Sequence, residues 1–91
     1  MFWYVLFVKA GKERKVEQYL MKQLDKEECI PFIPQQEILF RRSGVEKKEV
    51  KHLFPGYVFI ESILPGQDFI KVIKPLIHKL SDIISLLKYS N

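Results

Sequence analysis

The side chains that commonly do chemistry in proteins are few in this sequence, and they stand far apart. Cys29, His52 and His78 are candidate metal ligands, but their spacing fits no zinc signature. Cys29 lies between Glu28 and Ile30, where a small half-buried apolar residue is a better interpretation than a nucleophile. We therefore expect no metal site and no cofactor.

A hydrolytic site is not expected either. His78, Ser81 and Asp82 are the residue types of a catalytic triad, but they are near neighbours in the sequence. Hydrolytic triads are assembled from separate elements beside an oxyanion hole. The glycines stand singly, so no glycine-rich loop is present to hold a phosphate. The sequence predicts that the chain is not an enzyme.

One predicted strand carries a more specific pattern, because aromatic and aliphatic residues alternate along it. Tyr57 and Phe59 share one face of this strand, and Val58 and Ile60 share the other. If the aliphatic pair faces the core, the aromatic pair stands on the opposite side, where Phe7 of the first strand can join it. Such a face is either a second core layer under another helix or a docking surface. A docking surface of this kind could stack nucleic-acid bases or receive an apolar partner helix.

Basic residues form a second pattern. The net charge is +4, and at about 100° per residue Lys15, Lys22 and Lys26 fall on one flank of a predicted helix, with Lys12 close to that row. A row of ammonium groups can neutralise successive phosphates, whereas arginine adds a planar fork suited to specific contacts. A solvated charged surface explains the same residues equally well, since ordinary soluble domains carry net charges of about 2–8. The candidate nucleic-acid contacts are Lys9, Lys12, Arg14, Lys15, Lys22, Arg41 and Arg42.

Composition restricts the class of protein. A chain of 91 residues is one small domain, and 47% hydrophobic with 29% charged residues is a globular composition. A single cysteine excludes an internal disulfide. The longest apolar run, residues 2–8, is far shorter than the roughly 20 residues that a membrane span needs. We expect a soluble, cytoplasmic protein with no membrane partner.

The sequence predicts that these residues are positioned by strands and helices in the order β-α-β-β-β-α-β. This order indicates an α+β fold, with an antiparallel β-sheet flanked by helices. The first strand is apolar on both alternating sets, which indicates a central strand. Pro75 is expected to end the second helix, and for the last segment a helix capped by Ser81 is the alternative to a strand. The expected strands are residues 2–8, 37–42, 45–51, 57–61 and 83–89, and the expected helices include residues 16–24 and 67–74.

One known signature can be compared with the strand at residues 57–61. The RNA-recognition motif carries K/R-G-F/Y-G/A-F-V-x-F/Y on its third strand. Residues 55–62 match the Gly-aromatic and Phe-aliphatic pairs of this pattern. They lack the leading base, place Val58 where a small residue is required, and end in Ser62. A free-standing RNA-binding module of this type therefore stays an alternative.

Several motifs occur in an order that can be compared with a second family. Trp3-Tyr4-Val5 opens the chain, Gly11 precedes a charged helix, and residues 34–37, Pro-Gln-Gln-Glu, precede a strand. A basic hairpin then leads to residues 53–59, Leu-Phe-Pro-Gly-Tyr-Val-Phe. Together they resemble the amino-terminal (NGN) domain of the NusG family of transcription elongation factors, over roughly residues 2–89. Among its specialised paralogues the chain is most similar to LoaP, an antiterminator.

The resemblance implies a function. Such a domain binds the clamp helices of the largest subunit of RNA polymerase through an aromatic cavity, keeps the clamp closed and suppresses pausing. The matching cavity positions are Phe7, Phe54, Tyr57 and Phe59. The resemblance also implies contact with the non-template DNA strand or a nascent RNA hairpin, through basic residues near the first strand–helix junction. These are Lys9, Lys12, Lys15 and Arg14.

Two features depart from the family pattern. Residues 68–71, Asp-Phe-Ile-Lys, occupy the region in which a paralogue carries a polar run for a second polymerase contact, so that contact is not implied. The chain ends at Asn91, so residues 1–91 are expected to be an NGN domain that is incomplete at its carboxy-terminal end and lacks the family's small KOW domain.

Besides the RNA-binding module, a small structural or interaction domain remains as an alternative.

Overall fold

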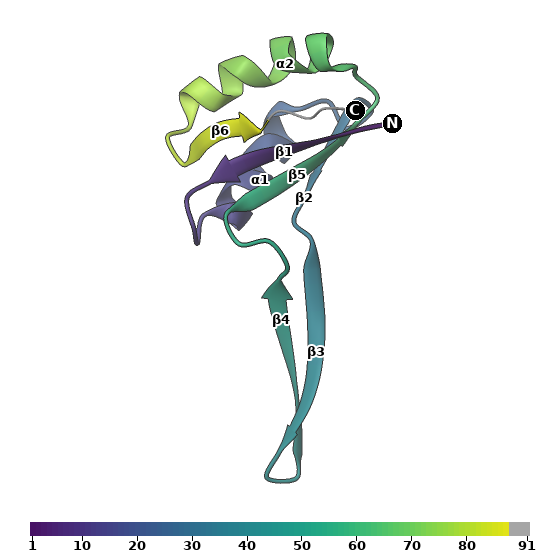
Figure 1. Cartoon of the computed structure of the whole chain (residues 1–91), viewed down its shortest axis with the longest axis vertical. Coiled ribbons are helices and arrows are strands. Elements are labelled where there is room, and N and C mark those ends of the chain that lie inside the picture. Colours follow the sequence, from purple (N-terminus) through teal and green to yellow (C-terminus); the bar gives the residue numbers. More distant parts are fainter. Residues whose placement is uncertain (88–91) are drawn as a thin grey trace.

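The main sheet is built around β1 (Phe2–Val8), which pairs antiparallel with a neighbour on each side (Figure 1). These neighbours are β5 (Tyr57–Ser62) and β6 (Ile83–Leu87). A further strand, β2 (Cys29–Phe32), pairs with the other side of β5 and completes the order β2-β5-β1-β6. The structure, a computed structural model, describes residues 1–87, without the side chains of Ile38, Phe40, Arg41 and Arg42.

Both helices pack on one face of this sheet, because each has an apolar stripe that must leave water. In α1 (Glu13–Gln23) the stripe includes Val16 and Leu20, and in α2 (Gly66–Lys79) it includes Phe69 and Ile73. The ring of Tyr4 stacks on Phe69 at 3.7 Å between centroids. The sheet residues of the core are those whose side chains point to the helices, including Tyr4, Leu6, Val8, Val58 and Ile60.

The remaining strands, β3 (Gln35–Arg42) and β4 (Val45–His52), form a hairpin that projects away from the main sheet (Figure 1). Ser43 and Gly44 link them with φ angles of 54° and 77°. Two consecutive positive φ angles are typical of the type I′ turn, whose twist matches that of the flanking strands. The hairpin predicted at residues 37–42 and 45–51 is therefore confirmed.

The fold class is also confirmed, but the structure adds one strand to the expected order. The short strand β2 was not predicted, because Pro31 and Pro34 indicated a break in regular structure. Proline cannot donate a backbone hydrogen bond, so it is tolerated in a sheet at an edge. β2 is an edge strand, since β5 is its single neighbour in the sheet.

The second helix extends further than predicted. The expected helix at residues 67–74 continues past Pro75 to Lys79. The turn after Pro75 buries Leu76, which is 8% exposed, and this burial offsets the backbone hydrogen bond that proline cannot make. Ile70, which was expected on the buried face, is 48% exposed because it lies on the flank of the stripe.

The last segment is a strand, as favoured, over residues 83–87, and residues 88–89 of the predicted strand lie outside the described residues. Within residues 1–87, neither helix is long and apolar enough to cross a membrane.

Replacing Pro75 by alanine is expected to stabilise the protein. Alanine restores the missing N–H and removes the clash of the proline ring with the preceding turn, so the free energy of unfolding should rise by about 1–3 kcal/mol in urea denaturation. The exposed neighbour Lys74 provides the control, since Lys74→Ala should change stability by no more than about 0.5 kcal/mol. Unchanged or lower stability for Pro75→Ala would show that the proline does not destabilise α2 in the folded protein.

Candidate functional site

The face of the sheet that the helices do not cover is rich in aromatic side chains. Residues of β1 and β5 that alternate with the core residues point to this side, and the Trp3 and Phe7 side chains are 53% and 37% exposed. Phe32 reaches the same face from β2, and Phe54 reaches it from the turn before β5. We call this surface the aromatic face; it consists of Trp3, Phe7, Phe32, Phe54, Tyr57 and Phe59.

The rings of the aromatic face touch one another. Phe59 lies at its centre, with ring centroids 5.7 Å from Phe32 and 5.5 Å from Phe54. Trp3 packs edge-on against Phe32 at 5.5 Å. Phe7 and Tyr57, which face each other across β1 and β5, are also 5.5 Å apart. These distances fall within the range of favourable aromatic pairs. The rings therefore form two packed groups on the same side of the sheet, one of four rings around Phe59 and the pair Phe7–Tyr57.

The structure thus brings together the four aromatic residues singled out in the sequence: Phe7, Phe54, Tyr57 and Phe59. Of the two interpretations left open, a second core layer is absent among the described residues, since no helix in residues 1–87 covers this face. Sequence reasoning missed Trp3 and Phe32. Trp3 has the same strand parity as Phe7 and could have been found, whereas Phe32 lies on the strand that was not predicted.

A buried carboxylate holds the turn that carries Phe54. Glu13, the first residue of α1, is 3% exposed, and its Oε2 accepts a hydrogen bond from the Gly56 N–H at 2.8 Å. The Gly56 carbonyl accepts one from the Val8 N–H, also at 2.8 Å. Gly56 has a φ of 87°, in the left-handed region that favours glycine. The two hydrogen bonds of Gly56 therefore connect the turn to both α1 and β1.

The ionisation of Glu13 depends on these contacts. Burial acts to raise the pKa of its carboxyl, but hydrogen bonds from backbone N–H groups, first that of Gly56, outweigh burial and hold the pKa below its ordinary value. The group is therefore a carboxylate at neutral pH. A charged acceptor makes a stronger hydrogen bond than a neutral one.

The predicted basic contacts fall into separate groups. Lys15 Nζ lies 2.8 Å from Asp82 Oδ2, and the Lys9 N–H donates to the Asp82 carbonyl at 2.9 Å. The hydrogen bond from Lys15, together with the charges of Lys9 and Lys12, lowers the pKa of the Asp82 carboxyl. We call Lys9, Lys12 and Lys15 the basic cluster. Because Lys15 is paired with Asp82, part of the positive charge expected there is neutralised.

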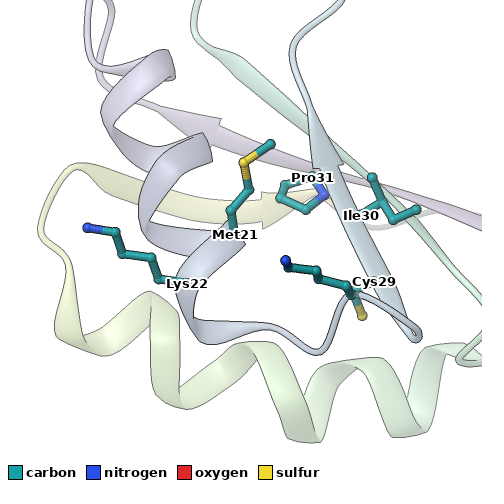
Figure 2. Close-up of a pocket in the computed structure, with 6 residues that line it drawn as sticks. Met21, Lys22, Cys29, Ile30 and Pro31 are labelled. Carbon is teal, nitrogen blue, oxygen red and sulfur yellow. The ribbon is translucent and has the colours of Figure 1, made fainter.

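The other predicted contacts have different surroundings. Arg14 forms an ion pair with Glu17 at 3.5 Å. Lys22, about two helical turns beyond Lys15, lies with Lys26 beside a groove of about 700 Å³ between α1 and β2 (Figure 2). The structure describes the backbone of Arg41 and Arg42 in β3, and their side chains lie outside what it describes.

Cys29 is buried, with its Sγ 3.3 Å from Ser62 Oγ. Burial raises the pKa of the thiol, which leaves it protonated and a poor nucleophile at neutral pH. The described part of the chain contains no group of three or more His, Cys, Asp or Glu side chains able to hold a metal ion.

Comparison with known proteins adds an independent finding. Residues 1–91 match the protein family described as transcription termination factor nusG. The transcription termination/antitermination protein NusG of Staphylococcus epidermidis is 32% identical over 72 residues, which cover 74% of this chain and 40% of that protein. The protein of the same name from Staphylococcus aureus is 31% identical over the same length. The chain thus spans less than half the length of these relatives.

Glu13→Gln tests the buried carboxylate. It should lower the free energy of unfolding at pH 7 by about 1 kcal/mol, because a neutral amide replaces a charged acceptor. The folded-state pKa of Glu13 lies below its unfolded value, so the carboxylate's contribution is fully present above the unfolded pKa of about 4.3 and is lost as the pH falls through the folded pKa. Urea denaturation between pH 7 and pH 3 should therefore show the two proteins converging at acidic pH.

The exposed Glu27 provides the control for this experiment, since Glu27→Gln should follow the wild type at every pH. A constant difference between Glu13→Gln and the wild type down to pH 3 would contradict the assigned role of the charge.

Proposed function

The chain belongs to the NusG family of transcription termination and antitermination factors, and on that premise we propose that it docks on RNA polymerase through the aromatic face. Members of this family are transcription factors, so the expectation that the chain is not an enzyme agrees with the family. The proposed partner is the pair of clamp helices of the polymerase's largest subunit. The proposed consequence of docking is suppression of pausing or termination.

The aromatic face is the observation that carries this proposal. Soluble proteins rarely expose large apolar patches, and those that they do expose often mark sites of interaction. Trp3 and Phe54 are each about half exposed, at 53% and 50%. A few residues, enriched in Trp, Tyr and Arg, carry most of the binding free energy in protein interfaces, and the aromatic face offers Trp3 and Tyr57. A pair of helices offers a matching apolar surface, because helices present side chains at i, i+3, i+4 and i+7 to a receiving surface.

We also propose that the chain acts as a specialised antiterminator of the LoaP type and contacts the non-template DNA strand or a nascent RNA hairpin. The basic cluster supports this proposal, since Lys9 and Lys12 are exposed at the junction of β1 and α1. Lys22 extends the positive charge along α1. Lysine binds phosphate as a point charge, so these residues would position a nucleic-acid backbone and read little of its sequence.

A second candidate function has some structural support. Without the β3–β4 hairpin, the elements run β-α-β-β-α-β, and a four-stranded sheet exposes aromatic rings on one face. RNA-recognition motifs stack bases on such a face. In that case the domain would bind single-stranded RNA through Tyr57 and Phe59 without any polymerase.

Tyr57→Ala is expected to weaken binding to RNA polymerase by about 30-fold, since truncating an aromatic anchor costs about 2 kcal/mol. The fold should persist, because the Tyr57 side chain lies on the uncovered face. The measurement is the dissociation constant for purified core enzyme, with circular dichroism to confirm folding. Ile70→Ala serves as the control, because Ile70 is exposed on the opposite, helical side.

Equal affinities for wild type and folded Tyr57→Ala would refute polymerase docking through this face. RNA binding without polymerase that depends on Tyr57 would favour the base-stacking module instead, and binding to neither partner would favour a structural domain.

The double variant Lys12→Ala/Lys22→Ala tests the nucleic-acid contact. If each lysine meets one phosphate, the slope of log affinity against log salt should become shallower by about 0.7–0.9 per lysine. Lys15 is left unchanged because it is paired with Asp82. The probes are a single-stranded DNA and an RNA hairpin, and the control is Lys71→Ala/Lys74→Ala on the exposed side of α2. Identical slopes for wild type and the Lys12/Lys22 variant would identify these lysines as solvated surface.

A further inference from the structure

One acidic side chain lies on the same side of the sheet as the aromatic rings. Glu61 follows Tyr57 and Phe59 at every second position of β5, so it points away from the helices. In the strand register it stands between Trp3 of β1 and Ile30 of β2. Among the described residues that point to this side from β1, β2 and β5, Glu61 is the only charged one.

The Glu61 carboxylate has no partner within the described part of the chain. No hydrogen bond or ion pair joins it to another described residue, and the side chain is already half-buried. Its neighbours across the sheet, Trp3 and Ile30, are both about half exposed, at 53% and 51%. A partner that covers Trp3 and Ile30 would therefore also remove water from Glu61. A carboxylate taken out of water without a partner is strongly unfavourable.

We propose that Glu61 and Trp3 together bind one basic side chain of the docked partner. This inference rests on the proposed function and specifies it: the aromatic face selects a polymerase helix that carries an arginine or lysine within its apolar surface. Directly opposed side chains on neighbouring strands have their Cβ atoms about 5 Å apart, so one cation can meet both groups. The carboxylate supplies a charge-assisted hydrogen bond, and the indole attracts the cation through its ring face. Arginine fits this pair best because its planar group can do both.

The pairing also accounts for the choice of partner. An apolar helix without a basic residue would bury Glu61 unpaired, and a helix with an acidic residue at that point would be repelled. The aromatic rings supply affinity for many apolar helices, whereas Glu61 distinguishes among them.

The test is Glu61→Gln, which keeps the shape of the side chain and removes its charge. We expect its affinity for nucleic-acid-free RNA polymerase core enzyme to be at least about tenfold lower than that of the wild type at low salt. The loss should shrink as salt is raised, because salt screens the ion pair that only the wild type makes. Glu61→Thr, a residue favoured in strands, should behave in the same way and replaces Glu61→Gln if that variant does not fold.

Two controls separate the possible failures. Glu27→Gln removes an exposed carboxylate from the α1–β2 connection and should bind like the wild type. If Tyr57→Ala also binds like the wild type, or if the wild type does not bind, the proposed function fails and this inference falls with it. If Tyr57→Ala weakens binding and Glu61→Gln does not, only the present inference is overturned. If Glu61→Gln lost the same factor in affinity at low and high salt, the inference would also be overturned. Such a result would mean that the partner group facing Glu61 is a neutral hydrogen-bond donor and not a cation.

Discussion

The aromatic face depends on one buried hydrogen bond, from the Gly56 N–H to the carboxylate of Glu13. Backbone hydrogen bonds already join Leu53, Phe54 and Gly56 of this turn to other residues, but the buried Gly56 N–H has the Glu13 side chain as its acceptor, and a buried N–H without an acceptor is costly. The first turn of a helix suits an acidic acceptor, because the amino-terminal end of a helix favours negative charge. Gly56 lies between Phe54 and Tyr57, so its bond to the start of α1 fixes the turn that carries Phe54 at the point where β5 begins.

The alternation of side chains along β1 and β5 gives the sheet two different faces. Leu6 and Val58 are fully buried beneath the helices. Their neighbours in the sequence, Phe7 after Leu6 and Tyr57 before Val58, lie on the uncovered side. A one-residue change in register would exchange the two sets. Stability and proposed docking therefore depend on the same pairing of strands: one side of the sheet supplies the core, and the other carries the aromatic face.

One of the basic residues has a structural role. Asp82 lies in the turn before β6, and its ion pair with Lys15 connects that turn to α1. The Asp82 carboxylate also interacts with the charges of Lys9 and Lys12 at the junction of β1 and α1, where both lysines are exposed. The positive charge available to a nucleic acid is consequently smaller than the count of lysines implies. Glu61, which is opposite Trp3, lies near the other end of β1 from Lys9.

The sequence alone determined the features that depend on neighbouring residues: the two faces of β5, the apolar stripe of α1, the Ser43–Gly44 turn and the grouping of Phe7 with Tyr57. Periodicity and turn chemistry are local, so a short stretch of chain specifies them. The tertiary structure decided what depends on distant residues. The hydrogen bond between Glu13 and Gly56 spans 43 positions. β2 becomes a strand because β5 offers it an edge, which adds Phe32 to the aromatic face. The apolar stripe of α2 continues past Pro75 to Leu76 at helical spacing, but only packing in the folded core decides that burial of Leu76 outweighs the hydrogen bond that proline cannot make.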